Sequence, residues 1–147
     1  MILETAADVE GFGARLGAAL RAGDVLCLSG DLGAGKTTLA RGILRGLGHQ
    51  GEVPSPTFSI LQGYEPPDVL LPVGHVDLYR LESAEEVDEL GLDDWLADGA
   101  LVIEWPDRLG GRFGAIALDL QLAVAAEGGR LLTAHVPPAW ETRWPLK

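Results

Sequence analysis

The first fifty residues alternate between the apolar spacing of helices and that of strands. Thr5 and Asp8 form the pattern of a capped helix start, and apolar residues then recur every three or four positions up to Leu20. Residues 24–29 are apolar on both faces, as a central strand of a parallel sheet should be. Residues 36–47 return to helical spacing and end at a glycine. The pattern predicts helix, strand, glycine-rich loop and helix.

The middle of the chain adds two apolar strands and one segment that cannot be a helix. Residues 52–64 contain Pro54 and Pro56, which favour an extended, surface-accessible segment. Apolar stretches at 69–78 and 100–103 predict the two strands, each ending at an acidic or polar position.

The remaining segments are acidic helices and a hairpin. Ser83, with a glutamate three residues later, predicts a capped acidic helix, and residues 92–96 predict another helical turn. Strict alternation of apolar and other residues over 116–124 predicts a strand with one buried face, and a glycine turn leads into its antiparallel partner at 131–136. The tail, 136–147, has no periodicity, and we expect it to be irregular.

Composition and charge limit the classes of function. A chain of 147 residues fits one compact domain. It has 22 acidic and 11 basic side chains and a formal charge of −11, so it offers no broad basic surface to nucleic acid. The only cysteine, Cys27, lies in an apolar run and is expected to be a buried, unreactive thiol. Neither a membrane span nor a signal peptide is recognisable, so we expect a cytoplasmic protein.

A phosphate-binding loop is the strongest single motif. Residues 30–37 fit G-x-x-x-x-G-K-[ST] in full, between a buried strand and a helix as the motif requires. Backbone N–H groups from Gly33 to Thr38 are expected to hold phosphate oxygens, Lys36 to reach the β and γ phosphates, and Thr37 to bind Mg²⁺. We therefore expect a single three-layer P-loop NTPase-like α/β domain over 1–147, with a mixed, mainly parallel sheet and a C-terminal antiparallel hairpin.

Two carboxylates have the placement that magnesium-dependent hydrolysis needs. Asp77 and Glu104 each stand at the C-terminal end of an apolar strand, where open α/β sheets bind ligands. Either one can hold the magnesium shell or orient the attacking water, and their division of roles stays open at this point.

The stretch Ser55-Pro56-Thr57-Phe58 is the kind of segment that senses a nucleotide. Its proline stiffens it, and its hydroxyls can respond to a γ phosphate or its metal. His75, Tyr79 and Arg80 flank Asp77, and packing or surface pairing is the more common role of such residues.

Guanine specificity of the common switch type is not expected. Guanine-specific switches use an [NT]-K-x-D signature, whereas this chain has no asparagine and its only lysine besides Lys36 is Lys147.

Four motifs together resemble the bacterial TsaE (YjeE) family. They are GDLGAGKTT at 30–38, SPTF at 55–58, HVDLYRL at 75–81 and IEW at 103–105. Their order and spacing agree with that family over about residues 5–107.

The resemblance implies a P-loop ATPase required for N6-threonylcarbamoyladenosine at position 37 of tRNA. In that family the protein binds the TsaB and TsaD proteins, and its ATP hydrolysis supports their turnover. It contacts tRNA only through them. By likeness, Lys36, Asp77 and Glu104 serve hydrolysis, and Thr37 and Glu104 hold Mg²⁺. Tyr79, Arg80 and Trp105 are candidate partner contacts. The implied nucleotide contacts come from the loop, the sensing segment and two outlying positions near the adenine: Asp31, Leu32, Gly33, Ala34, Gly35, Lys36, Thr37, Thr38, Thr57, Thr5 and Arg130.

Two other interpretations remain open on the sequence. A small-molecule kinase would use Arg108 and Arg112 as a lid over the phosphates, although little of the chain is left to form an acceptor pocket. A structural subunit would bind nucleotide without hydrolysing it.

Overall fold

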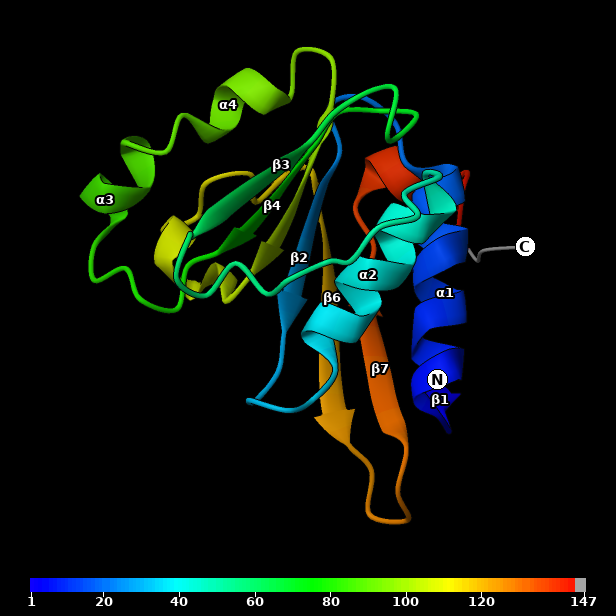
Figure 1. The fold of residues 1–147 in the computed structure, drawn as a ribbon. Coiled ribbons are helices and arrows are strands. Elements are labelled where there is room, and N and C mark those ends of the chain that lie inside the picture. Colours follow the sequence, from blue (N-terminus) through cyan, green and yellow to red (C-terminus); the bar gives the residue numbers. More distant parts are fainter. Residues whose placement is uncertain (145–147) are drawn as a thin grey trace.

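The computed structural model describes residues 1–144 and is built on one seven-stranded sheet (Figure 1). The strands lie in the order β1-β7-β6-β2-β5-β4-β3. Their bounds are β1 Ile2–Leu3, β2 Val25–Ser29, β3 Leu61–Tyr64, β4 Val73–Asp77, β5 Ala100–Glu104, β6 Ala117–Val124 and β7 Arg130–His135. The four central strands, from β6 to β4, are mutually parallel. The strands β3 and β7 pair antiparallel with β4 and β6, and β1 pairs antiparallel with β7. The mixed sheet and the C-terminal hairpin predicted from the sequence are confirmed.

Helices cover both faces of this sheet and produce three layers. The helical segments are α1 Ala6–Ala19, α2 Lys36–Gly46, α3 Ala84–Asp88, α4 Leu92–Trp95 and the 3₁₀ turns η1 Pro106–Leu109 and η2 Pro138–Trp140. The long helices α1 and α2 lie side by side on one face, and their apolar sides pack on Leu26, Leu28 and Val102 of the central strands (Figure 1). The short segments α3, α4 and η1 cover the opposite face over β4 and β5. The three-layer P-loop NTPase-like fold expected from the sequence is therefore confirmed.

Helices α1 and α2 approach each other through glycines. A Cβ atom on Gly42 of α2 would overlap the backbone carbonyl oxygen of Glu10 in α1, and one on Gly17 of α1 would overlap that of Ile43. This close approach holds α2, whose first turn carries the phosphate-loop lysine, firmly against the rest of the domain.

We expect Gly42→Ala to lower the free energy of unfolding by about 2 kcal/mol, because overpacking costs about 1–3 kcal/mol and exceeds the helix preference of alanine. Denaturant unfolding measures the change. Gly11→Ala is the matched control, since a Cβ on Gly11 meets no atom within 4 Å and the residue is exposed. Equal stability of Gly42→Ala and wild type would show that the two helices can move apart at little cost.

Two segments differ from the sequence-based expectations. Residues 52–64 are not extended throughout, because a turn over 56–59, closed by the Ile60 N–H to the Pro56 carbonyl, precedes β3. Proline excludes a helix interior but suits a turn, and the pattern could not separate the two alternatives. The strand β1 was not predicted, since two residues carry no period.

The tail is anchored although it lacks periodicity. Trp140 of η2 is fully buried, and the Arg143 guanidinium lies 3.9 Å from its ring centroid. Arg143 also pairs with Asp24 at 2.6 Å between Nη1 and Oδ2. The last part of the tail, 145–147, lies outside the described residues.

Candidate functional site: a phosphate-binding loop facing two buried carboxylates

The glycine-rich loop connects the end of β2 to the start of α2. No side chain caps the N-terminus of α2, and its N-cap residue Gly35 has a left-handed backbone with φ of 107°. The first N–H groups of a helix have no partner within the helix, so those of α2 are free to bind an anion. The loop thus has the geometry of a phosphate cradle.

Gly30 is the position at which the loop requires glycine most strictly. Its φ is 147°, and a Cβ atom there would overlap the backbone carbonyl oxygen of Leu122 in β6. A Cβ on Gly33 meets no protein atom within 4 Å, so its left-handed φ of 81° is what favours glycine there.

Lys36 is folded back over the loop. Its Nζ donates hydrogen bonds to the backbone carbonyl oxygens of Gly30 and of Asp31, and it lies 4.1 Å from the ring centroid of Trp105. Burial lowers the pKa of the Lys36 ammonium, while the nearby carboxylates of Glu104, Asp77 and Asp31 oppose that shift. Lys36 is thus a buried cation next to three acids.

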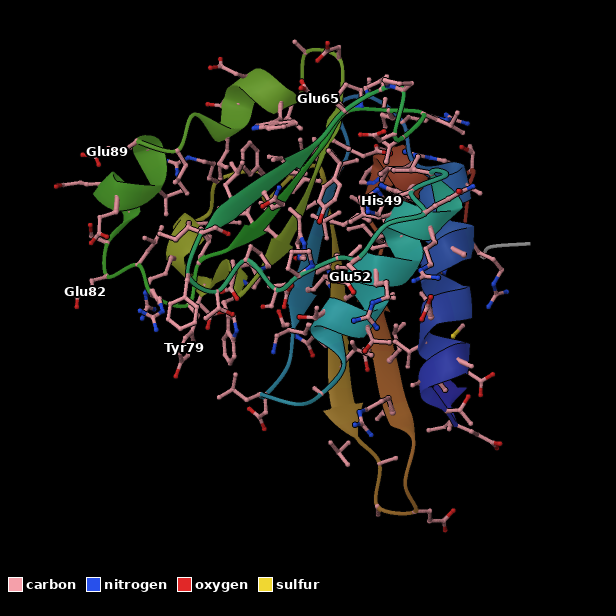
Figure 2. All side chains as sticks on the ribbon, viewed as in Figure 1. His49, Glu52, Glu65, Tyr79, Glu82 and Glu89 are labelled. Atoms are coloured by element: carbon pink, nitrogen blue, oxygen red, sulfur yellow. The ribbon has the colours of Figure 1, made fainter. Side chains whose placement is uncertain are left out.

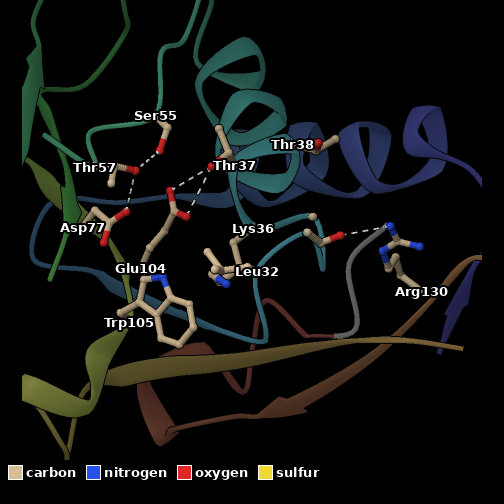
Figure 3. Close-up of a pocket in the computed structure, with 12 residues that line it drawn as sticks. Leu32, Lys36, Thr37, Thr38, Ser55, Thr57, Asp77, Glu104, Trp105 and Arg130 are labelled. Carbon is tan, nitrogen blue, oxygen red and sulfur yellow. Dashed lines mark hydrogen bonds between the residues drawn. The ribbon is translucent and has the colours of Figure 1, made fainter. Parts of the chain in front are cut away.

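Asp77 and Glu104 are direct neighbours in the sheet. They are register partners at the ends of the parallel strands β4 and β5, and both side chains are buried. Both oxygens of Glu104 face the Thr37 hydroxyl, at 3.4 and 3.5 Å (Figure 3). Asp77 instead accepts from the backbone N–H of Tyr79 at 2.9 Å. The two carboxylates therefore line one cavity side by side and are held by different partners.

Thr57 links the turn at 56–59 to this pair of acids. Its hydroxyl donates to Asp77 Oδ2 at 3.3 Å and lies 2.8 Å from the Ser55 hydroxyl (Figure 3). A change at Asp77 would therefore directly alter the hydrogen bonding of the turn.

Arg130 closes the opposite side of the loop from the start of β7. It donates from Nε to the Ala34 carbonyl at 2.9 Å and from Nη2 to the Gly33 carbonyl at 3.1 Å. Beside it is a small cavity that Thr5 lines, about 110 Å³ in volume. It shares Gly35, Thr38 and Arg130 with the larger cavity at the phosphate loop. The Thr5 hydroxyl itself caps α1 by accepting from the Asp8 N–H.

The cavity at the phosphate loop, about 270 Å³ in volume, brings most of the predicted residues together. Its lining is Leu32, Gly33, Gly35, Lys36, Thr37, Thr38, Ser55, Thr57, Asp77, Glu104, Trp105 and Arg130 (Figure 3). Asp31 and Ala34 do not line it, and they contribute backbone carbonyl oxygens that fix Lys36 and Arg130. Three residues of the site are absent from the predicted catalytic and binding set: Ser55, which belongs to the predicted sensing segment, Trp105, which was predicted as a partner contact, and His75, which hydrogen-bonds Glu104.

Burial also distinguishes the site. Five polar or charged side chains are buried among the described residues: Asp24, Lys36, His75, Asp77 and Glu104. Asp24 pairs with Arg143, and the other four lie at the loop. Charged groups are rarely buried unless structure or chemistry requires it, so their concentration at one cavity marks a functional site.

The donor set suits a hard cation that is shared with phosphate. Within residues 1–144 no cluster of three or more histidine, cysteine or acidic side chains can form a dedicated metal cage. The Thr37 hydroxyl and the two carboxylates nevertheless supply oxygen ligands next to the loop. Mg²⁺ keeps several waters and commonly takes one or two carboxylates plus phosphate oxygens, so these residues fit it.

Comparison with known proteins identifies the family of the chain. A family model described as "Threonylcarbamoyl adenosine biosynthesis protein TsaE" matches residues 3–132. The chain belongs to the TsaE family. The matched range contains all the predicted site residues, from Thr5 to Arg130.

Individual relatives agree with this assignment to the TsaE family. A "tRNA threonylcarbamoyladenosine biosynthesis protein TsaE" of Mycobacterium tuberculosis is 43% identical over 122 residues, covering 78% of this chain and 73% of the relative. The protein of the same name from Streptomyces coelicolor is 50% identical over 94 residues, covering 63% of this chain and 64% of the relative, just under two thirds of its length. The crystal structure of YdiB from Bacillus subtilis superposes with a TM-score of 0.78 at 30% identity, covering 94% of this chain and 85% of that one.

The surface around the site is acidic and partly aromatic. Tyr79 lies at the rim, with its ring centroid 4.8 Å from that of Trp105, and Glu82 and Glu89 project outward from the α3 region (Figure 2). Nearby, the Arg80 guanidinium lies 4.1 Å from the ring centroid of Phe58, which is 80% exposed. No helix among the described residues has the length and apolar character needed to cross a membrane.

Proposed function

We propose that this member of the TsaE family is a Mg²⁺-dependent P-loop ATPase that takes part in the biosynthesis of tRNA threonylcarbamoyladenosine. The observation that carries the proposal is the arrangement of two buried carboxylates, Asp77 and Glu104, across one cavity from an uncapped helix N-terminus and Lys36. Phosphate binding alone would not require either buried acid, whereas hydrolysis needs a metal ligand and a group that orients water.

Each residue has a role that follows from its position. The N–H groups of the loop and α2 bind phosphate oxygens, and Lys36 moves from the loop carbonyls to the β and γ phosphates. Thr37 and Glu104 hold Mg²⁺, which would neutralise charge on the phosphates during transfer. Asp77, next to Glu104 in the same cavity, accepts a hydrogen bond from the attacking water and orients it.

The proposed partners are the TsaB and TsaD proteins. The exposed Phe58 and the Thr57 hydroxyl belong to one turn, so a change at Asp77 reaches a surface that another protein can contact. The formal charge of −11 disfavours direct binding of tRNA. We propose that the protein contacts tRNA only through these partners and that it acts in the cytoplasm.

A small-molecule kinase is the less favoured alternative. Arg108, one of the two candidate lid residues, donates from Nε to the Leu81 carbonyl at 2.6 Å, and the other, Arg112, pairs with Asp88 of α3. Arg112 lines a cavity with Cys27 and Asp119 that is separate from the phosphate loop. Neither arginine is therefore positioned to close over the site.

The fate of the γ phosphate tests the proposal. With γ-³²P-labelled ATP and Mg²⁺, we expect the label to be released as inorganic phosphate in the presence of TsaB and TsaD, with the same yield when extracted cellular metabolites are added. Label appearing on a metabolite would support the kinase. Bound ATP that is never cleaved, even with both partners, would support a structural subunit.

A further inference from the structure

A buried histidine lies directly behind the proposed metal ligand. His75 is on β4, two residues before Asp77, and its side chain is fully buried. Its Nε2 lies 2.6 Å from Glu104 Oε2, across the β4–β5 pair. The bonds from the Thr37 hydroxyl are 3.4 and 3.5 Å long, so the histidine makes the shortest hydrogen bond to this carboxylate among the described residues.

The partners of the imidazole define which nitrogen carries its proton. Among the described residues, Nδ1 of His75 is buried with no hydrogen-bond partner. A proton on Nδ1 would leave a buried N–H without an acceptor, which costs about 1–3 kcal/mol, whereas a bare lone pair is tolerated more readily. The carboxylate of Glu104 only accepts, so the neutral ring with its proton on Nε2 satisfies both groups.

We propose that His75 is a positioning residue for Mg²⁺ binding, acting by holding the Glu104 carboxylate toward Thr37. The inference rests on the proposed function and assigns one more residue to it. His75 touches neither the cavity nor a phosphate, since it is absent from the lining, and it acts only through Glu104. A carboxylate held through one oxygen by a short hydrogen bond keeps its remaining lone pairs aimed at the metal position.

The sheet makes His75 well suited to this task. His75 and Asp77 alternate with Val76 along β4, so both face α2, as Glu104 of β5 does. Without the histidine, Glu104 would retain only its long contacts with Thr37, although its side chain is 2% exposed. A buried carboxylate with weak partners would turn toward other donors, and Lys36 is the nearest candidate cation of the loop.

The experiment compares His75→Leu with His75→Gln, whose amide nitrogen can replace Nε2 as donor. The dissociation constant of the non-hydrolysable ATP analogue AMPPNP is measured by calorimetry with Mg²⁺ and with EDTA. We expect Mg²⁺ to tighten binding to the wild type, and His75→Leu to lose about 10-fold or more of that enhancement, the range typical of groups behind a metal ligand. His75→Gln should stay within about 3-fold of wild type, and affinity in EDTA should not change in either variant.

The controls separate a positioning role from a general loss of structure. His135→Leu replaces an exposed histidine outside the cavity and should leave both constants unchanged. An unchanged Mg²⁺ enhancement in His75→Leu, an equal loss in His75→Gln, or a parallel loss of affinity in EDTA would each overturn the proposal. If wild type itself shows no Mg²⁺ enhancement, the proposed function fails. If wild type shows it and His75→Leu keeps it, only the role of His75 fails.

A measurement on the unmodified protein remains decisive if a variant does not fold. Long-range ¹H–¹⁵N correlation spectra report which nitrogen of His75 is protonated. We expect a neutral ring protonated on Nε2, with a shift of the Nε2 resonance on adding AMPPNP and Mg²⁺ that is absent with AMPPNP and EDTA. A proton on Nδ1, or an Nε2 resonance that does not respond to Mg²⁺, would contradict the proposal.

Discussion

Lys36→Ala is expected to weaken ATP binding by about 100-fold, because it removes charge-assisted hydrogen bonds worth about 1.5–3 kcal/mol each to the phosphates. Lys36 is the only lysine of the chain within the described residues, so no neighbouring ammonium can replace it. Calorimetric titration with Mg²⁺ and AMPPNP measures the effect without turnover.

Arg45→Ala is the matched control for the lysine variant. Arg45 is a cation on the same helix, α2, but it pairs with Glu10 at 3.0 Å at the far end and is half exposed. Loss of a surface pair costs about 0–1 kcal/mol of stability, and AMPPNP affinity should not change. Wild-type affinity in Lys36→Ala would show that the phosphates bind elsewhere.

Asp77→Asn is expected to lower the rate of ATP hydrolysis by about 100-fold while changing ATP affinity by less than about 3-fold, because a group that acts only in the transition state affects turnover and not binding. The asparagine keeps the acceptor for the Tyr79 N–H and can still meet Thr57, so the local structure should persist. Steady-state turnover and equilibrium binding, measured on the same preparation, separate the two effects.

Comparison with Glu104→Gln separates the role of magnesium ligand from the role of orienting water. That variant should raise the Mg²⁺ concentration needed for half-maximal turnover, whereas Asp77→Asn should leave it unchanged. Asp119→Asn, a strand carboxylate beside Cys27 in the sheet and outside the cavity, serves as the control. The opposite outcome, with Asp77→Asn changing the Mg²⁺ requirement and Glu104→Gln only the rate, would exchange the roles assigned above.

The sequence predicted the parts of the site that depend on local pattern. The phosphate loop is one continuous segment, and its flanking strand and helix follow from apolar spacing, so Lys36 and Thr37 were found directly. Asp77 and Glu104 were found because parallel strands bring their C-terminal ends to one edge of a sheet. That they are register partners on adjacent strands could not be predicted, because the pattern of one strand does not reveal which strand lies beside it.

Residues that depend on strand order or on turn geometry were harder to find. For His75 the sequence alone favours a structural role, although its spacing of two from Asp77 puts both residues on one face of a strand. What was missing was the knowledge that β5, with Glu104, lies next to β4. Gly30 requires a small residue because β6 passes close to the loop, a contact between segments ninety residues apart that no local pattern reveals.

The most direct test of the central claim is ATP turnover by the wild type and Lys36→Ala, each alone and with TsaB and TsaD. The account predicts slow release of inorganic phosphate by the wild type alone, faster release with both partners, and none above background for Lys36→Ala in either case. Turnover that the partners do not change, or that survives in Lys36→Ala, would contradict a partner-controlled ATPase built on this loop.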